Sequence, residues 1–163
     1  MAFDAYLKLK GVEGEATQKG FEKQIPLLSF SFGAHNPSSP VGSGAGAGKV
    51  QISAFTISKW TDKSSVQLFQ TCCSGKHFPD AKVTLLKAGG DKPVEYLTYE
   101  FKELFVNDIQ WSGSSGGDDV PMETVGFSFA QVEVKYTEQK ADGTPGTPQV
   151  AGWDLKGGKA LGK

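Results

Sequence analysis

Residues 122–137 read METVGFSFAQVEVKYT, and this stretch decides the fold. Polar and apolar residues alternate along it, which is the pattern of a strand that buries one face. The apolar set is Val125, Phe127 and Phe129, followed with the opposite parity by Val132, Val134 and Tyr136. The change of parity indicates a bulge near Ala130 and Gln131, and such a break lets one strand serve two sheets, as a barrel corner requires.

Similar strand patterns fill most of the remaining chain. They are FDAYLKLK at 3–10, IPLLSFSFG at 25–33, KVQISAFTISKW at 49–60, AKVTLLKAGG at 81–90 and PVEYLTYEFKELFVNDIQW at 93–111. Parity changes again near Ala54, GGDKP at 89–93 is typical of a hairpin turn, and the long segment 93–111 is expected to bend around Glu103. The sequence predicts one mainly β domain over 1–163, an antiparallel two-sheet β-barrel with one flanking α-helix.

The one helix is predicted over residues 61–76, TDKSSVQLFQTCCSGK. Thr61 or Asp62 is suited to cap its start, and Gly75 is suited to end it in a left-handed conformation. The predicted buried stripe is Val66, Phe69 and Cys73, with Leu68 and Cys72 beside it. On this reading the adjacent cysteines are buried free thiols, because neighbouring cysteines bridge each other only through a strained ring.

Two segments interrupt the strand patterns, an extended loop at about 34–48 and a Gly/Pro-rich tail at about 138–163. The loop ends in GSGAGAGK, which has the glycine content of a phosphate-binding loop but not its spacing. A P-loop requires glycine at position 43 and Ser or Thr at position 50, but the chain has Ser43 and Val50. The dinucleotide fingerprint requires glycine at position 47, where the chain has Ala47. A strand pattern follows instead of a helix, so we expect no nucleotide cofactor here.

Composition excludes several classes of partner. The formal net charge is −1 and all 17 basic residues are lysine, so the arginine fork that reads phosphate and guanine is missing and no nucleic acid is expected. No apolar run approaches the ~20 residues of a membrane helix, so no membrane insertion is expected. The opening residues alternate in polarity, and we expect no secretory signal peptide.

No constellation of residues predicts catalysis or a metal. Cys73 and His77 could form a nucleophile pair, but a cysteine on an apolar helix stripe is typical of a core. The carboxylate pairs Asp118–Asp119 and Glu13 with Glu15 are typical of solvated turns and lack the spread of ligands that calcium needs. We expect no enzyme activity, no metal and no cofactor.

Two interpretations of the residues remain open at this point. In the first, exposed strand edges pair between copies of the chain. If each copy offers one edge to a different edge of its neighbour, the contact is heterologous, and the copies close into a ring when the rotation between neighbours permits it. The alternative is a monomeric ligand-binding β-barrel that uses Trp111 or Trp153 as an aromatic platform.

Taken in order, the segments resemble a known family over about residues 3–156. They are YLKLKGVEGE, LLSFSFG, GSGAGAGKVQ, KWTDKSSVQLFQTCCSGKHFPDAKVTLLKAGG, VEYLTYEFKELFVNDI, ETVGFSFAQVEVKY and GWDL. The block from the helix through KAGG is the most specific. Together they resemble the haemolysin-coregulated protein family, Hcp, the tube protein of the bacterial type VI secretion system.

The resemblance implies a phage-tail-tube-like subunit that forms hexameric rings, which stack into a tube. Its implied partners are a contractile sheath, a spike protein and effector proteins carried in the lumen. Assembly in the bacterial cytoplasm and export without a signal peptide are implied as well. We expect a plain structural member of the family, with no fused effector domain after the tail.

The resemblance also suggests roles for two sets of residues. In that family the loop after the second strand reaches the adjacent ring, which would make the glycine-rich stretch a ring-stacking loop. Its residues are Gly42, Ser43, Gly44, Ala45, Gly46, Ala47, Gly48 and Lys49. Ser29 and Ser31 lie opposite Phe30 and Phe32 in the strand alternation, so we expect the two serines to face the lumen, where small hydroxyls would hold cargo only loosely.

Overall fold

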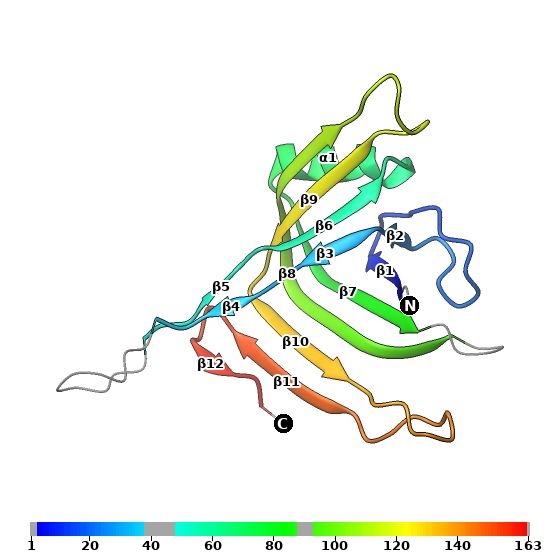
Figure 1. The fold of residues 1–163 in the computed structure, drawn as a ribbon. Coiled ribbons are helices and arrows are strands. Elements are labelled where there is room, and N and C mark those ends of the chain that lie inside the picture. Colours follow the sequence, from blue (N-terminus) through cyan, green and yellow to red (C-terminus); the bar gives the residue numbers. More distant parts are fainter. Residues whose placement is uncertain (1–2, 38–47, 88–92, 163) are drawn as a thin grey trace.

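The computed structural model describes residues 3–37, 48–87 and 93–162 (Figure 1). The strands are β1 (Phe3–Leu9), β2 (Ile25–Leu27), β3 (Ser29–Ser31), β4 (Ala34–His35), β5 (Gln51–Ile52), β6 (Phe55–Trp60), β7 (His77–Lys87), β8 (Val94–Ser112), β9 (Met122–Ser128), β10 (Gln131–Tyr136), β11 (Gln149–Asp154) and β12 (Lys159–Ala160). The helix α1 spans Lys63–Ser74. A mainly β chain with one flanking helix is therefore confirmed.

The strand β8 organises the architecture because it belongs to two layers. Its first half pairs with β7 on one edge and β10 on the other, while its second half pairs with β9. Between the halves Glu103 has a φ of 51°, a left-handed backbone that bends the strand where the sequence predicted a bend. The two predicted sheets are thus joined through β8 into one antiparallel sheet of ten strands.

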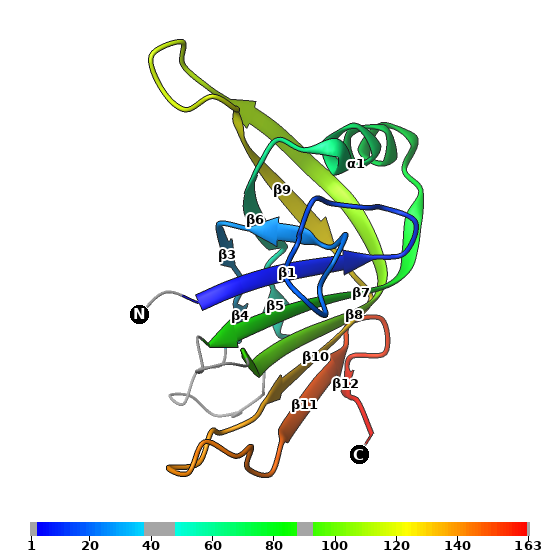
Figure 2. The ribbon, with the colours of Figure 1, turned by 90° about the vertical axis from the view of Figure 1, so that its right-hand side faces the viewer.

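Figure 2 shows the first layer, with β1, β7, β8, β10 and β11 side by side. The second layer is β3, β6, β9 and the end of β8, seen in front in Figure 1. Residues 25–31 connect the layers, because β2 pairs with β1 whereas β3 pairs with β6. The amide of Leu28, between them, donates to the Ser58 carbonyl at 2.8 Å. On this side the two layers are therefore joined by the chain itself and by this one hydrogen bond, not by a strand pairing.

Both predicted parity breaks coincide with a change of strand. The chain leaves β5 at Ile52 and enters β6 at Phe55, which pairs with different strands. Likewise β9 ends at Ser128, and β10 begins at Gln131 in the other layer. The predicted bulges are instead short gaps between strands, but the parity changes did locate the two points at which the chain moves between partners.

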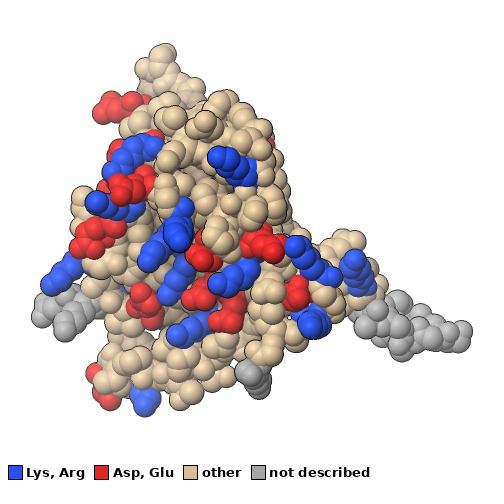
Figure 3. Space-filling model, turned by 180° about the vertical axis from the view of Figure 1, so that it is seen from behind, with Lys and Arg blue, Asp and Glu red and all other residues tan. Residues whose placement is uncertain are grey.

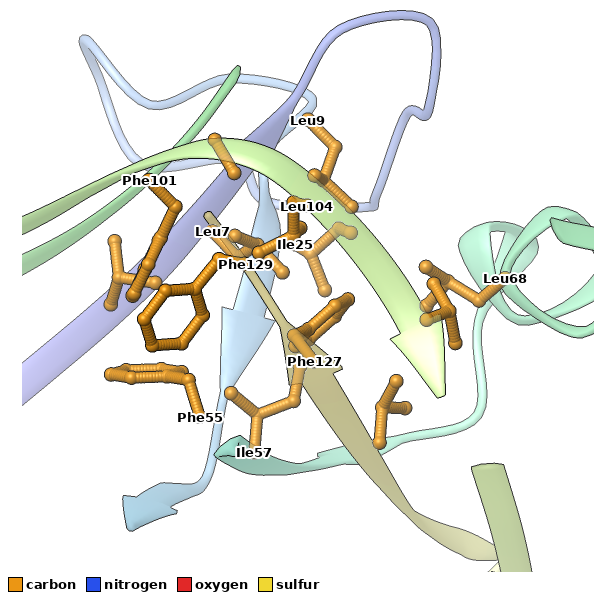
Figure 4. Close-up of a cluster of buried hydrophobic side chains, with 14 of the residues drawn as sticks. Leu7, Leu9, Ile25, Phe55, Ile57, Leu68, Phe101, Leu104, Phe127 and Phe129 are labelled. Carbon is orange, nitrogen blue, oxygen red and sulfur yellow. The ribbon is translucent and has the colours of Figure 1, made fainter. Parts of the chain in front are cut away.

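Aromatic rings fill the space between the layers (Figure 4). Phe55 is 1% exposed and its ring lies 5.0 Å from Phe101 and 5.3 Å from Tyr99 between centroids. Phe101 in turn lies 4.8 Å from Phe129. Burial, followed by the neighbouring Tyr96, raises the pKa of the Tyr99 phenol above its usual value, so this ring stays neutral within the cluster.

The helix ends are capped as predicted, but its buried face is not the predicted one. Asp62 caps the start and forms a capping box with Ser65. Val66 is 72% exposed, Phe69 is 48% exposed and Cys73 is exposed. The face packed on the sheet carries Ser64, Ser65 and Leu68. The prediction of a Val66–Phe69–Cys73 stripe was wrong because the polar first turn is bound to buried side chains of the sheet, which sets the rotation of the helix.

The cysteine prediction is corrected with the helix. Both thiols are free, as expected, but Cys72 is half-buried and Cys73 exposed. They are therefore not a pair of buried core residues. The hydrophobic face of the helix contributes Leu68, at 0% exposure, to the core instead.

Gly75 ends the helix with a φ of 70°, and its amide donates to the Thr71 carbonyl at 3.0 Å. Gly75→Ala is expected to lower the free energy of unfolding by about 1 kcal/mol, because a Cβ is disfavoured in this left-handed conformation. Gly116→Ala is the matched control, since a Cβ at Gly116 meets nothing within 4 Å and its φ is not in the positive region. Equal stability of the two variants in urea denaturation would contradict the expectation.

The two segments predicted as loop and tail contain strands. Within 34–48, the residues Ala34–His35 form β4, which pairs with β5 as a two-stranded ribbon. Within 138–163, β11 adds to the edge of β10 over six residue pairs, and β12 follows it. The Gly/Pro content concealed these strands because each depends on pairing with another segment of the chain, not on its own sequence pattern. The turn at 89–92 lies outside the described residues, although the pairing of β7 with β8 confirms the hairpin.

Candidate functional site

Part of the outer face of the second layer carries mostly small polar residues in two rows, and we call these two rows the hydroxylated face. The rows cross β3, β6, β9 and β8 in register. One row is Ser29, Ser58, Thr124 and Gln110, and the other is Ser31, Thr56, Gly126 and Asp108. The hydroxyls of Ser29 and Ser58 lie 2.5 Å apart. These two rows offer hydroxyl groups to a neighbour, whereas the next row toward the end of β6 carries Trp60 and Met122, which are 39% and 38% exposed.

The alternation within β3 fixes the direction of the two serines. Phe30, between them, stacks on Phe55 with centroids 5.6 Å apart and planes at 4°. Because successive strand residues point to opposite sides, Ser29 and Ser31 are held on the outer face, where both are exposed. The structure thus places the two serines together on one surface with Ser58 and Thr56.

Gly126 lies at the centre of this face. The register between β8 and β9 shifts between Val106 and Asp108, which leaves Asn107 as an extra residue. A Cβ on Gly126 would lie 2.9 Å from the Asn107 side-chain oxygen. The bulge thus holds the Asn107 side chain close to Gly126, which is buried.

The two described segments that flank the glycine-rich stretch, β4 and β5, pair as a ribbon. We define the arm as residues 34–52, of which β4 and β5 form the base (Figure 1). At Gly48 a Cβ would lie 3.1 Å from Pro37, so the two limbs of the arm run close together there. Of the predicted stacking residues, Gly48 and Lys49 are described, with Lys49 exposed, while 42–47 lie outside the described residues.

A buried ionic cluster that the sequence analysis missed lies beneath the end of this face. The Lys59 ammonium, 1% exposed, donates to Glu123 at 2.6 Å, to Asp62 at 2.9 Å and to Ser65 at 3.1 Å. Ser65 also donates to Glu123 at 2.8 Å. These contacts fasten the first turn of α1 to β6 and β9, because Lys59 and Glu123 are directly opposite each other in the sheet.

Strand parity could have revealed this cluster. Lys59 has the parity of the buried Phe55 and Ile57, and Glu123 has that of the buried Val125. A lysine and a glutamate that continue two inward-facing sets predict a buried pair, since a charge is rarely buried without a partner. The cluster is a fastening between elements, with each charge satisfied by its neighbours.

The other candidates from the sequence lie apart from the hydroxylated face. His77 contacts the Phe105 ring at 5.4 Å. Glu13 pairs with Lys23 at 3.7 Å and with Lys63 at 3.5 Å. Within residues 3–37, 48–87 and 93–162, no group of three or more His, Cys, Asp and Glu side chains is arranged to hold a metal ion. None of the helices described has the length and hydropathy of a membrane span.

The two tryptophans proposed as ligand platforms have different surroundings. Trp153 is half-buried and packs against the core from β11. Trp111 is 42% exposed and its ring lies 5.6 Å from that of Phe69 on the helix. Neither ring therefore stands over the hydroxylated face.

Comparison with known proteins places this arrangement in one family. The family described as "Type VI secretion system effector, Hcp" matches residues 6–136. The chain is 42% identical to protein hcp1 of Pseudomonas aeruginosa over 158 residues, which cover 96% of this chain and 97% of that protein.

Solved structures agree. One described as a type six secretion system protein has a TM-score of 0.92 at 34% identity and covers 98% of this chain and 100% of its own. Hcp1 from Salmonella typhimurium has a TM-score of 0.82 at 35% identity, with 99% and 100% covered. The likeness extends over essentially the whole chain in both sequence and fold. The chain therefore belongs to the Hcp family and is a tube subunit of the type VI secretion system.

Proposed function

We propose that six copies of this chain form a ring with the hydroxylated face toward the lumen, and that rings stack through the arm. Secretion by the type VI system and a structural, non-enzymatic role are properties of the family. The proposal adds assembly in the bacterial cytoplasm, export without a signal peptide, and contacts with the sheath, the spike and effectors in the lumen.

The hydroxylated face is the observation that carries the proposal. The opposite outer face, on the first layer, is densely charged with both signs intermixed (Figure 3). Across its strands Lys8 lies beside Lys82, which pairs with Glu100 at 3.8 Å. A conduit needs an inner wall that does not hold passing chains tightly, and neutral hydroxyls form weaker contacts than charged groups do.

Unpaired strand edges supply a means of closing the ring. Among the described strands, β3 pairs along one edge only, and β8 has no partner on the β7 side from Val106 to Ser112. These are the two ends of the four-stranded second layer. Two different edges that meet between neighbouring copies form a heterologous contact, which gives a ring when the rotation closes.

Labelling of an introduced cysteine tests which face lines the lumen. In a Cys72→Ala/Cys73→Ala background, a small maleimide is expected to label Ser31→Cys fully in the assembled ring. A large polymer maleimide should label only a fraction of the sites, because the bulky chains exclude one another from a single lumen. Lys82→Cys, on the charged face, is the control and should accept both reagents. Mass spectrometry counts the labels.

Full labelling of Ser31→Cys by the polymer would show that this face is not enclosed. The proposal as a whole requires a cyclic oligomer. Negative-stain images and sedimentation that show only single subunits at all concentrations would overturn it.

A further inference from the structure

The strand β8 pairs with no neighbouring strand at the residue where it bends. On one edge its pairing passes from β10, whose last partner is Lys102, to β9, whose first partner is Phe105. On the other edge Pro79 of β7 falls opposite Glu103, and the register omits this pair. A proline has no amide to donate, so it interrupts the hydrogen bonds between strands. The sheet itself therefore does not fix the angle at which β8 turns from the first layer into the second.

The bend also carries backbone strain. Glu103 has a φ of 51°, a left-handed conformation that glycine adopts easily and that a side chain disfavours. Such a residue persists where its surroundings hold it, and its retention points to a role for its side chain. A hollow of about 360 Å³, lined in part by Glu103, Phe105 and Leu155, lies beside the bend. Packing thus leaves room for the angle to change, and another contact must hold it.

The turn between β11 and β12, residues 154–158, provides that contact. Its Lys156 ammonium donates to the Glu103 carboxylate. The Asp154 carboxylate fixes the shape of the turn, because it accepts from the amides of Lys156 and Gly157, each at 3.0 Å. The lysine that binds the bend therefore comes from a turn that is itself held by hydrogen bonds.

Two backbone hydrogen bonds tie the same turn to the bend. The Ala130 amide donates to the Lys102 carbonyl at 3.0 Å, and the Leu155 amide donates to the Ala130 carbonyl at 2.8 Å. Ala130 lies in the short gap between β9 of the second layer and β10 of the first. The turn is therefore connected to two points at which the chain passes between the layers, the bend in β8 and the gap between β9 and β10.

We propose that the turn 154–158 is a brace that sets the angle between the two layers, with Glu103 as the positioning residue on which it acts. Glycine would relax the backbone at this point but would provide no carboxylate for Lys156. The brace lies within one subunit, so it does not depend on the proposed ring. Within a ring it would also set the direction of the free edges of β3 and β8, which belong to the second layer.

Distance measurements across the bend test the brace. In a Cys72→Ala/Cys73→Ala background, spin labels at Lys135→Cys on β10 and Gln110→Cys on β8 report the angle by double electron–electron resonance, since both positions are exposed. Co-expression with an excess of the cysteine-free chain keeps labelled copies apart. Lys156→Met is expected to widen the distribution of distances, because the bend loses the side chain that holds it.

Two further variants separate the brace from a general loss of stability. Glu103→Asn should give the same widening, because asparagine tolerates the left-handed conformation but has no charge for Lys156. The exchanged pair Glu103→Lys/Lys156→Glu should restore the narrow distribution. Lys82→Met is the control, since it breaks an exposed ion pair between β7 and β8 away from the bend, and it should leave the distribution narrow. An unchanged distribution in Lys156→Met, or no recovery in the exchanged pair, would overturn the proposal.

Hydrogen exchange followed by mass spectrometry gives a second readout without labels. Peptides that contain the amides of Ala130 and Leu155 should exchange about twofold to fivefold faster in Lys156→Met, which is the size expected for the loss of one exposed ion pair. Peptides from β1, which lies away from the turn, should exchange at unchanged rates. Equal acceleration throughout the chain would indicate a general loss of stability and would count against a brace at this position.

Discussion

Lys59→Met is expected to lower the free energy of unfolding by about 3–5 kcal/mol, the usual cost of removing one partner from a buried ion pair. The Glu123 side chain is 0% exposed and would be left with only hydroxyl partners, Ser65 at 2.8 Å and Thr61 at 3.3 Å. The loss should appear in urea denaturation at one fixed protein concentration, because assembly makes the apparent stability depend on concentration.

A matched exposed pair and a double variant separate the cause. The Lys82 side chain is 41% exposed and its partner Glu100 is 49% exposed. Lys82→Met should therefore change the free energy of unfolding by no more than about 1 kcal/mol. Lys59→Met with Glu123→Leu removes both buried charges and should recover much of the loss. A Lys59→Met protein within 1 kcal/mol of the parent would show that Lys59 does not act as the partner of Glu123.

Phe55→Ala is expected to cost a similar amount, about 3–5 kcal/mol, because it empties the centre of the aromatic cluster. The Phe55 ring contacts residues of both layers, Phe30 on β3 and Tyr99 and Phe101 on β8. Loss of the ring should also weaken the near-ultraviolet circular dichroism signal that these fixed aromatic groups produce.

The control for this variant is a phenylalanine at the surface. Phe105 is 40% exposed, so Phe105→Ala should cost about 1 kcal/mol, with little change in ring assembly. Phe55→Leu retains most of the volume and should fall between the two. Equal losses for Phe55→Ala and Phe105→Ala would contradict the central position assigned to Phe55.

Alternation of residues was enough to predict most of the strands and the breaks between them. The parity changes near Ala54 and Ala130 located both points where the chain moves between partners. The bend at Glu103 followed from length alone, since an ordinary strand is much shorter than β8. Local pattern succeeds here because a strand with one buried face must alternate wherever it lies in the sheet.

The rotation of the helix could not be read in the same way. Its sequence contains two overlapping apolar arcs, and periodicity assigned the buried position to Phe69. The structure instead buries Ser64 and Ser65, because Ser65 binds a glutamate more than fifty residues away. A contact between distant segments thus outweighed the local apolar pattern.

The candidate site was predicted in part. The alternation of Ser29 and Ser31 with Phe30 correctly predicted an exposed polar face, but the contributions of Ser58, Thr124 and Gly126 depend on the register between strands. The lumenal position of the hydroxylated face remains a prediction.

The continuity of β8 bears on how a tube wall would carry mechanical load. Its 19 residues run as one strand from the first layer, whose outer face is charged, through the bend at Glu103 and into the second layer, which carries the hydroxylated face. A force that shifts the outer surface of the wall relative to the inner surface would pull on the covalent backbone of β8. The hydrogen bonds of β8 to β7 and β10 in one layer, and to β9 in the other, would resist this force together. A column pushed from one end would therefore transmit thrust as a single wall, without slip between its inner and outer surfaces.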